Sequence, residues 1–173
     1  MAVTDHGIFL GVFARSADPS HPMSKMPIAR RLFGPDGKVA GQSYRDIFAE
    51  VRVGTDILGV TTPREKLEAW QYVVDAANRH NDPGKFTTFI AYEWTATPDN
   101  QNLHRNVIFR GDGAPVPFTA FDSTNPEDLW AWMDRVRESG TDVLAIPHNA
   151  NLSDGRMFEK LDSLDQPLSA SYA

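Results

Sequence analysis

Four side chains able to bind a metal ion adjoin short apolar segments in this sequence: His6, Glu93, His104 and His148. Glu93 directly follows the run 86–92, whose β-branched and aromatic residues predict a strand. His148 lies two residues past the apolar run 143–146, a second predicted strand. Because catalytic groups of α/β barrels gather where strands end and loops begin, these residues are candidates for one shared site.

The other two candidates have similar positions. His6 follows a short apolar segment that resembles the end of a strand, and His104 opens the predicted strand 106–110. Neutral imidazole and carboxylate groups bind zinc, manganese and iron, and a catalytic site leaves room for water. A bound metal lowers the pKa of that water. The pattern therefore favours a divalent metal site that supports hydrolysis, with Glu93 also acting in catalysis.

Each of these residues also has an ordinary structural use. A lone histidine at a strand end is often a capping or hydrogen-bonded residue. Glu93 could be a rim carboxylate paired with Arg105. Trp94, the next residue after Glu93, could wall a pocket or pack in the core.

Two arginines are candidate catalytic residues that contact an anionic group of a substrate. Arg105 directly follows His104. Arg156 lies in the polar, glycine-containing loop after His148. Guanidinium groups suit such anions because they donate several hydrogen bonds in a fixed geometry. For Arg156 an ordinary turn explains the same residue types equally well.

The composition limits the classes of site. The chain has 173 residues, no cysteine and five histidines, so a transition-metal site must use histidine and carboxylate. His21 and His80 lie in a loop and at a helix end, where structural roles are expected. The formal net charge of -6 argues against nucleic acid as a partner. No apolar run approaches the ~20 residues that cross a bilayer, and the first residues lack a signal-peptide pattern, which indicates a soluble protein of unknown localisation.

Local signals predict two helices. Thr62-Pro63-Arg64-Glu65 has the form of a capping box, and Leu67, Trp70, Val74 and Ala77 then recur at helical spacing. Asn125 starts the second helix, which Gly140 ends. Residues 15–43 are rich in Pro, Gly and Ser, and we expect a long surface excursion with a short helix near 26–32.

Strands are expected over 86–92, 106–110 and 142–146. Their alternation with the helices favours an α/β fold, and the length suits a single domain, 1–173.

Four blocks carry a family resemblance, and they occur in order along the chain: Thr4-Asp5-His6-Gly7, Ala91-Tyr92-Glu93-Trp94-Thr95, His104-Arg105-Asn106-Val107-Ile108-Phe109 and Ile146-Pro147-His148-Asn149. The segment 151–158 also fits. Together they resemble the family catalogued as domain of unknown function 3604. That family is similar to the polymerase and histidinol phosphatase (PHP) superfamily of metal-dependent phosphoesterases.

The resemblance implies a distorted barrel of parallel strands with metal ions at one face. His6 would bind one metal, Glu93 would bridge two, and His104 and His148 would complete one coordination sphere. The superfamily pattern also has a His-x-His pair upstream and an Asp-x-His motif downstream. Neither is present, so we expect a partial barrel, incomplete at both termini, that is a fragment of a longer family domain.

Two functional hypotheses follow. The first is a metal-dependent hydrolase of small phosphate or related anionic esters, including sulfate esters. The second is a truncated, non-catalytic segment that binds metal or a partner. A homo-oligomer that covers open sheet edges is one form of the second, because unpaired edges must be covered or paired.

Overall fold

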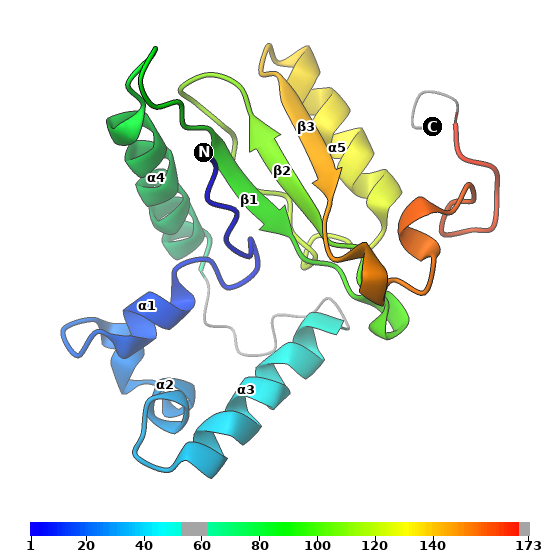
Figure 1. The fold of residues 1–173 in the computed structure, drawn as a ribbon. Coiled ribbons are helices and arrows are strands. Elements are labelled where there is room, and N and C mark those ends of the chain that lie inside the picture. The colour runs from blue at the N-terminus through cyan, green and yellow to red at the C-terminus, as the bar shows by residue number, and fades with distance from the viewer. Residues whose placement is uncertain (53–61, 170–173) are drawn as a thin grey trace.

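The computed structural model describes residues 1–52 and 62–169, which form a mixed α/β structure (Figure 1). Three strands form an antiparallel sheet in the order β1-β2-β3. Their bounds are Ile90–Trp94 for β1, Arg105–Phe109 for β2 and Val143–Pro147 for β3. All three lie at or within a few residues of the predicted runs.

The N-terminal segment lies along the outer edge of β1 (Figure 1). It pairs with β1 in the parallel direction through bridges Ala2–Phe89 and His6–Glu93. The Glu93 N–H donates to the Asp5 carbonyl at 2.8 Å, and the Gly7 N–H donates to the Glu93 carbonyl at 2.8 Å. A Cβ at Gly7 would lie 2.7 Å from the Tyr92 ring, so glycine permits this close approach.

Two long helices pack on one face of the sheet. They are α4, Pro63–His80, and α5, Pro126–Glu138. Thr62 and Glu65 form the predicted capping box of α4. Trp70 is buried against Tyr92 and Phe109 of the sheet, as the helical spacing predicts. Leu67 was expected on the same face, but it is 51% exposed.

Residues 15–43 lie largely at the surface, as expected, but they do not form a long loop. Much of this stretch is helical, and the short helix expected near 26–32 is one of its elements. Prolines occupy first helical turns here, where the missing N–H costs little, and Met23, Ala29 and Ile47 are buried. The elements are α1 Val12–Ala17, η1 Pro22–Lys25, α2 Pro27–Leu32 and α3 Gly37–Arg52. Short 3₁₀ turns η2 Pro98–Asn100, η3 Ala150–Leu152 and η4 Arg156–Phe158 follow later.

The described strands do not form the parallel barrel that the resemblance implied. They pair antiparallel in an open sheet. The short connection 95–104 returns the chain directly beside β1, whereas a parallel neighbour needs a longer crossover. Among the described residues, no helix combines the length and apolar character needed to span a membrane.

The two faces of the sheet differ in character. Tyr92 packs on Trp70 of α4 and Trp132 of α5, so this face holds the core. Successive side chains of a strand alternate between faces. Glu93 therefore projects to the opposite face, which it shares with its register partner Asn106 and with Ile146.

Candidate functional site

The centre of the candidate site is a buried pair. Glu93 Oε1 and His104 Nδ1 lie 2.7 Å apart, and the two residues are 5% and 8% exposed. Within the part of the chain that the structure describes, neither atom has a hydrogen-bond partner in good alignment. Buried polar atoms of this kind are rare in folded proteins, so the pair is a marked feature.

Strand register explains why these residues meet. Trp94 of β1 faces Arg105 of β2, so Glu93 and His104, the residue before β2, lie near the same end of the sheet. The His148 N–H donates to the His104 carbonyl at 2.9 Å, which brings the end of β3 alongside. Segments far apart in sequence thus converge at the end of the sheet near η2 and η3 (Figure 1).

His6 joins the pair from the N-terminal segment. Its Nδ1 lies 3.6 Å from Glu93 Oε2 and 2.7 Å from Thr95 Oγ1. The rings of His6 and His104 are nearly perpendicular, with centroids 6.3 Å apart. The His6 side chain remains 45% exposed, so the cluster is open to solvent on this side.

The electrostatics favour a charged carboxylate. Burial by itself raises the pKa of Glu93. The close contact with His104 and the charges of His6, His104 and His148 outweigh burial, so the pKa of Glu93 is lowered below its ordinary value. A carboxylate held ionised among imidazoles is a donor set that zinc, manganese and iron accept.

The predicted ligands are brought together to different degrees. Glu93, His104 and His6 are in contact, and the His148 backbone is bonded to His104. Over residues 1–52 and 62–169, no group of three or more acidic or histidine side chains already surrounds a single point as metal ligands do. The carboxylate and imidazole groups of the cluster are donors that a metal cation accepts. A complete coordination sphere remains a prediction.

Arg105 lies away from this cluster. It is 6% exposed, and its guanidinium carbon is 5.8 Å from the ring centroids of both Trp94 and Trp130. It donates to the Leu103 carbonyl at 2.6 Å, and burial lowers the pKa of Arg105 to about 10. The arginine and Trp94 thus belong to the core face of the sheet, and Trp94 packs there.

Arg156 lies at the surface beside η2. Its guanidinium donates to Gln101 Oε1 at 2.8 Å and lies 3.5 Å from an Asp99 carboxylate oxygen. Glu159 is a further ion-pair partner at 3.6 Å. The side chain is 31% exposed, and its contacts join the segment 98–101 to the segment 156–159.

His21 has the structural role that its loop position predicts. Its ring accepts a hydrogen bond from the Met23 N–H at 3.2 Å and so caps η1. His80 ends α4, as expected, and is exposed.

Sequence reasoning missed three polar residues at the cluster. Thr95 contacts His6, and Thr97 Oγ1 lies 3.1 Å from His104 Nε2. Asn106 faces Glu93 across β1 and β2, and its buried Oδ1 has no partner among the described residues. The alternation Glu93-Trp94-Thr95-Ala96-Thr97 is the signal that could have found the two threonines.

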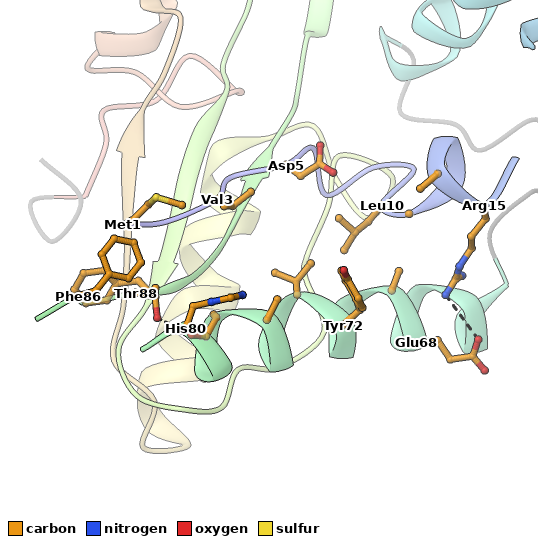
Figure 2. Close-up of a pocket in the computed structure, with 17 residues that line it drawn as sticks. Met1, Val3, Asp5, Leu10, Arg15, Glu68, Tyr72, His80, Phe86 and Thr88 are labelled. Carbon is orange, nitrogen blue, oxygen red and sulfur yellow. Dashed lines mark hydrogen bonds and ion pairs between the residues drawn. The ribbon is translucent and has the colours of Figure 1, made fainter. Parts of the chain in front are cut away.

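A groove of ≈ 870 Å³ lies away from the cluster, between the N-terminal segment and α4 (Figure 2). Its walls are mostly apolar and include Val3, Leu10 and Tyr72, with Arg15 paired to Glu68 at one end. None of the four predicted metal ligands lines this groove. The size of the groove is therefore no evidence for a catalytic site there, and the cluster of Glu93, His104 and His6 remains the candidate site.

Comparison with protein families places the whole chain in one of them. The family model described as "Protein of unknown function (DUF3604)" matches residues 1–173. Comparisons with curated proteins and with solved structures found no match.

Proposed function

This chain belongs to the DUF3604 family, and from that premise we propose that it is a metal-dependent hydrolase of phosphate or related anionic esters, sulfate esters included. One observation carries the proposal. It is the buried contact of Glu93 Oε1 with His104 Nδ1, at 2.7 Å, beside the half-exposed His6.

The argument for a cation at this point is electrostatic. A carboxylate oxygen and an imidazole nitrogen at 2.7 Å repel through their lone pairs unless a positive charge lies between them. A proton on His104 Nδ1 can supply that charge, and the contact with His104 lowers the pKa of Glu93. A divalent cation shared by both groups satisfies the same lone pairs.

Glu93, His104 and His6 would hold this cation, with His148 as a further ligand. When bound, the cation would polarise a water molecule and an ester oxygen, which is the chemistry that hydrolysis of anionic esters needs. Glu93 keeps the site negative, because the pKa of Glu93 is lowered and its carboxylate stays ionised near neutral pH. The exposed side of His6 leaves an approach for a small substrate.

An anionic substrate also requires a positive contact. Arg156 is the better candidate of the two predicted arginines, because it is partly exposed beside the loops that border the cluster. Its ion pairs with Asp99 and Glu159 are long, at 3.5 and 3.6 Å, so an ester anion can compete for the guanidinium. Arg105 would have to leave its two tryptophans.

The resemblance to the PHP superfamily supports the same proposal through the order of its motifs. The alternative is a non-catalytic segment that binds metal or a partner. Leu144 and Ile146 favour the partner form, since they are 50% and 48% exposed on neighbouring positions of the open face. A homo-oligomer that covers this face would appear as a dimer in sedimentation experiments.

The test combines metal content with turnover. The purified protein is analysed by mass spectrometry for metals, and hydrolysis of chromogenic phosphate and sulfate esters is measured before and after chelation. We expect a bound divalent metal and hydrolysis that chelation abolishes and metal restores. Hydrolysis that persists after complete chelation would refute the metallohydrolase. Metal binding without turnover of any ester would favour the non-catalytic alternative.

A further inference from the structure

The outer edge of β3 is an unpaired strand edge. β3 is the last strand in the order β1-β2-β3, and within residues 1–52 and 62–169 no segment pairs with its other side (Figure 1). Its five residues, Val143–Pro147, carry no charge, and Leu144 and Ile146 are 50% and 48% exposed. An apolar edge without charged residues is a template for a further strand. The edge of β3 is therefore a surface to which another strand can bind.

The ladder with β2 determines which backbone groups of β3 point outward. The His148 N–H donates to the His104 carbonyl at 2.9 Å, so these two residues form a hydrogen-bonded pair. Hydrogen-bonded and non-hydrogen-bonded pairs alternate along an antiparallel ladder. The backbone groups at even positions of β3 therefore point to β2. Those of Val143, Ala145 and Pro147 point away from it, to the unpaired edge.

A second copy of β3 fits this edge with Ala145 opposite Ala145 of the partner subunit. The two alanines exchange both of their N–H···O bonds in this register. The Val143 N–H donates to the carbonyl of Pro147 of the partner subunit. Proline has no N–H to donate in return, but the Val143 carbonyl already accepts from Arg137 Nη2 at 2.9 Å. Every outward backbone group of β3 then has a partner.

The same register also matches the side chains. Leu144 lies opposite Ile146 of the partner subunit in a non-hydrogen-bonded pair, where opposing side chains are closest. Asp142 lies opposite His148 of the partner subunit, which places a carboxylate acceptor beside an imidazole that can donate. A shift of two residues in one direction would place Asp142 opposite the apolar Ile146. A shift in the other direction would place Pro147 opposite Ala145, whose carbonyl would lose its donor.

We propose that this chain forms a homodimer in which two copies of β3 pair antiparallel about Ala145 and join the two sheets into one. The contact is isologous, because the same edge serves both copies. The inference does not rest on the proposed function, because such a dimer is compatible with hydrolysis and with the non-catalytic alternative. It places Asp142 of the partner subunit beside His148, at the margin of the candidate site.

Sedimentation velocity over a range of concentrations compares wild type with Ala145→Pro and Ile146→Lys. Proline at position 145 removes an N–H that points away from β2, so the protomer loses no hydrogen bond of its own. Lysine at position 146 puts a charge on the edge strand. Leu164→Lys is the matched control, because Leu164 is 77% exposed and lies outside the sheet. Far-UV circular dichroism establishes that each variant is folded.

We expect wild type and Leu164→Lys to dimerise with the same dissociation constant. Both β3 variants should raise that constant at least about 10-fold, because they remove the central hydrogen bonds or bring two charges together at the edge. A wild type that stays monomeric at every concentration would overturn the dimer. A wild-type dimer that both folded β3 variants retain with an unchanged constant would overturn the pairing through β3.

Disulfide cross-linking tests the register and leaves the backbone of the edge unchanged. The chain has no cysteine, so Leu144→Cys and Ile146→Cys each introduce a single thiol. The two variant proteins are mixed and oxidised, and the products are identified by mass spectrometry. In the proposed register position 144 faces position 146 of the other subunit, with the Cα atoms about 4.5 Å apart, which a disulfide can span.

The mixed disulfide between positions 144 and 146 should predominate over the two disulfides that join identical positions. A predominant 144–144 or 146–146 disulfide would mean a register shifted by two residues and would overturn the pairing about Ala145. The absence of any cross-linked product would overturn the β3 contact itself.

Discussion

Glu93 Oε1 and His104 Nδ1 lie 2.7 Å apart in the protein interior without an aligned hydrogen bond between them. An unsatisfied buried polar atom costs about 1–3 kcal/mol. A proton on His104 Nδ1, or a cation bound between the two atoms, would remove this cost. The relationship between these two residues therefore governs the predictions for the site.

Replacing Glu93 with glutamine should lower zinc affinity by more than about 100-fold. Loss of a residue that only hydrogen-bonds a metal ligand lowers affinity by ~10–100-fold. Glutamine keeps the size of the side chain but removes the negative charge that the cation requires. Ester hydrolysis should fall with the affinity. Competition titration and a chromogenic ester assay measure the two effects.

His80→Ala is the control for this variant. His80 is exposed at the end of α4, so its loss should change neither zinc affinity nor hydrolysis. If Glu93→Gln binds zinc as tightly as His80→Ala, Glu93 is not a ligand and the site must be assigned elsewhere.

Changing His148 to alanine tests the fourth predicted ligand. The backbone bond from the His148 N–H to the His104 carbonyl is kept in this variant, so the strand end should stay in place. Zinc affinity should fall at least ~10-fold if the ring is a ligand, because the coordination sphere opens. Unchanged affinity, together with an unchanged melting temperature, would limit the ligand set to Glu93, His104 and His6.

Stability should depend on pH through Glu93. The pKa of Glu93 is lowered in the folded protein, so the folded state binds its proton less readily than the unfolded chain does. The carboxylate then contributes stability that is fully present above the unfolded pKa, about 4.3, and is lost as pH falls through the lower folded value. Metal-free wild type should lose stability below about pH 4.5 more steeply than Glu93→Gln.

Urea unfolding of both proteins from pH 7 to pH 3 measures this difference. The difference in unfolding free energy between wild type and Glu93→Gln should be constant near pH 7 and should become smaller toward pH 3. A gap that widens as the pH falls would mean that the pKa of Glu93 is raised, which would contradict the electrostatic account of the cluster.

Local signals predicted the elements whose ends are set by local chemistry. The capping box at Thr62 and the stop at Gly140 depend on neighbouring residues alone, and both helices begin and end as expected. The other helices within residues 15–43 were missed because short helices depend on packing with distant residues. The antiparallel strand pairing is likewise a non-local property, and composition gave no sign of it.

The sequence also predicted the candidate site only in part, because some of its contacts depend on non-local geometry. Motif order identified Glu93 and His104, which lie together, but not the threonines, whose contacts depend on where the two rings point. The position of Arg105 away from the cluster was predictable from strand alternation. Strand alternation puts Arg105 on the face opposite to Asn106, and therefore opposite to Glu93.

The last prediction separates structural from functional roles on α4. Trp70 is 2% exposed, packs on Tyr92 and Phe109, and donates its indole N–H to the Ala114 carbonyl at 3.2 Å. Trp70→Ala should lower the free energy of unfolding by ~3–5 kcal/mol, because it leaves a large cavity in the core. Urea unfolding of the variant and of wild type gives this value.

Leu67→Ala is the matched control on the same helix, and its exposed side chain predicts a change within about 0.5 kcal/mol. Zinc titration of the folded variants gives a second readout. Both variants should bind zinc as wild type does wherever they are folded, since α4 lies on the face of the sheet opposite to Glu93. A Trp70→Ala protein of normal stability that no longer binds zinc would contradict this assignment and make the tryptophan part of the site.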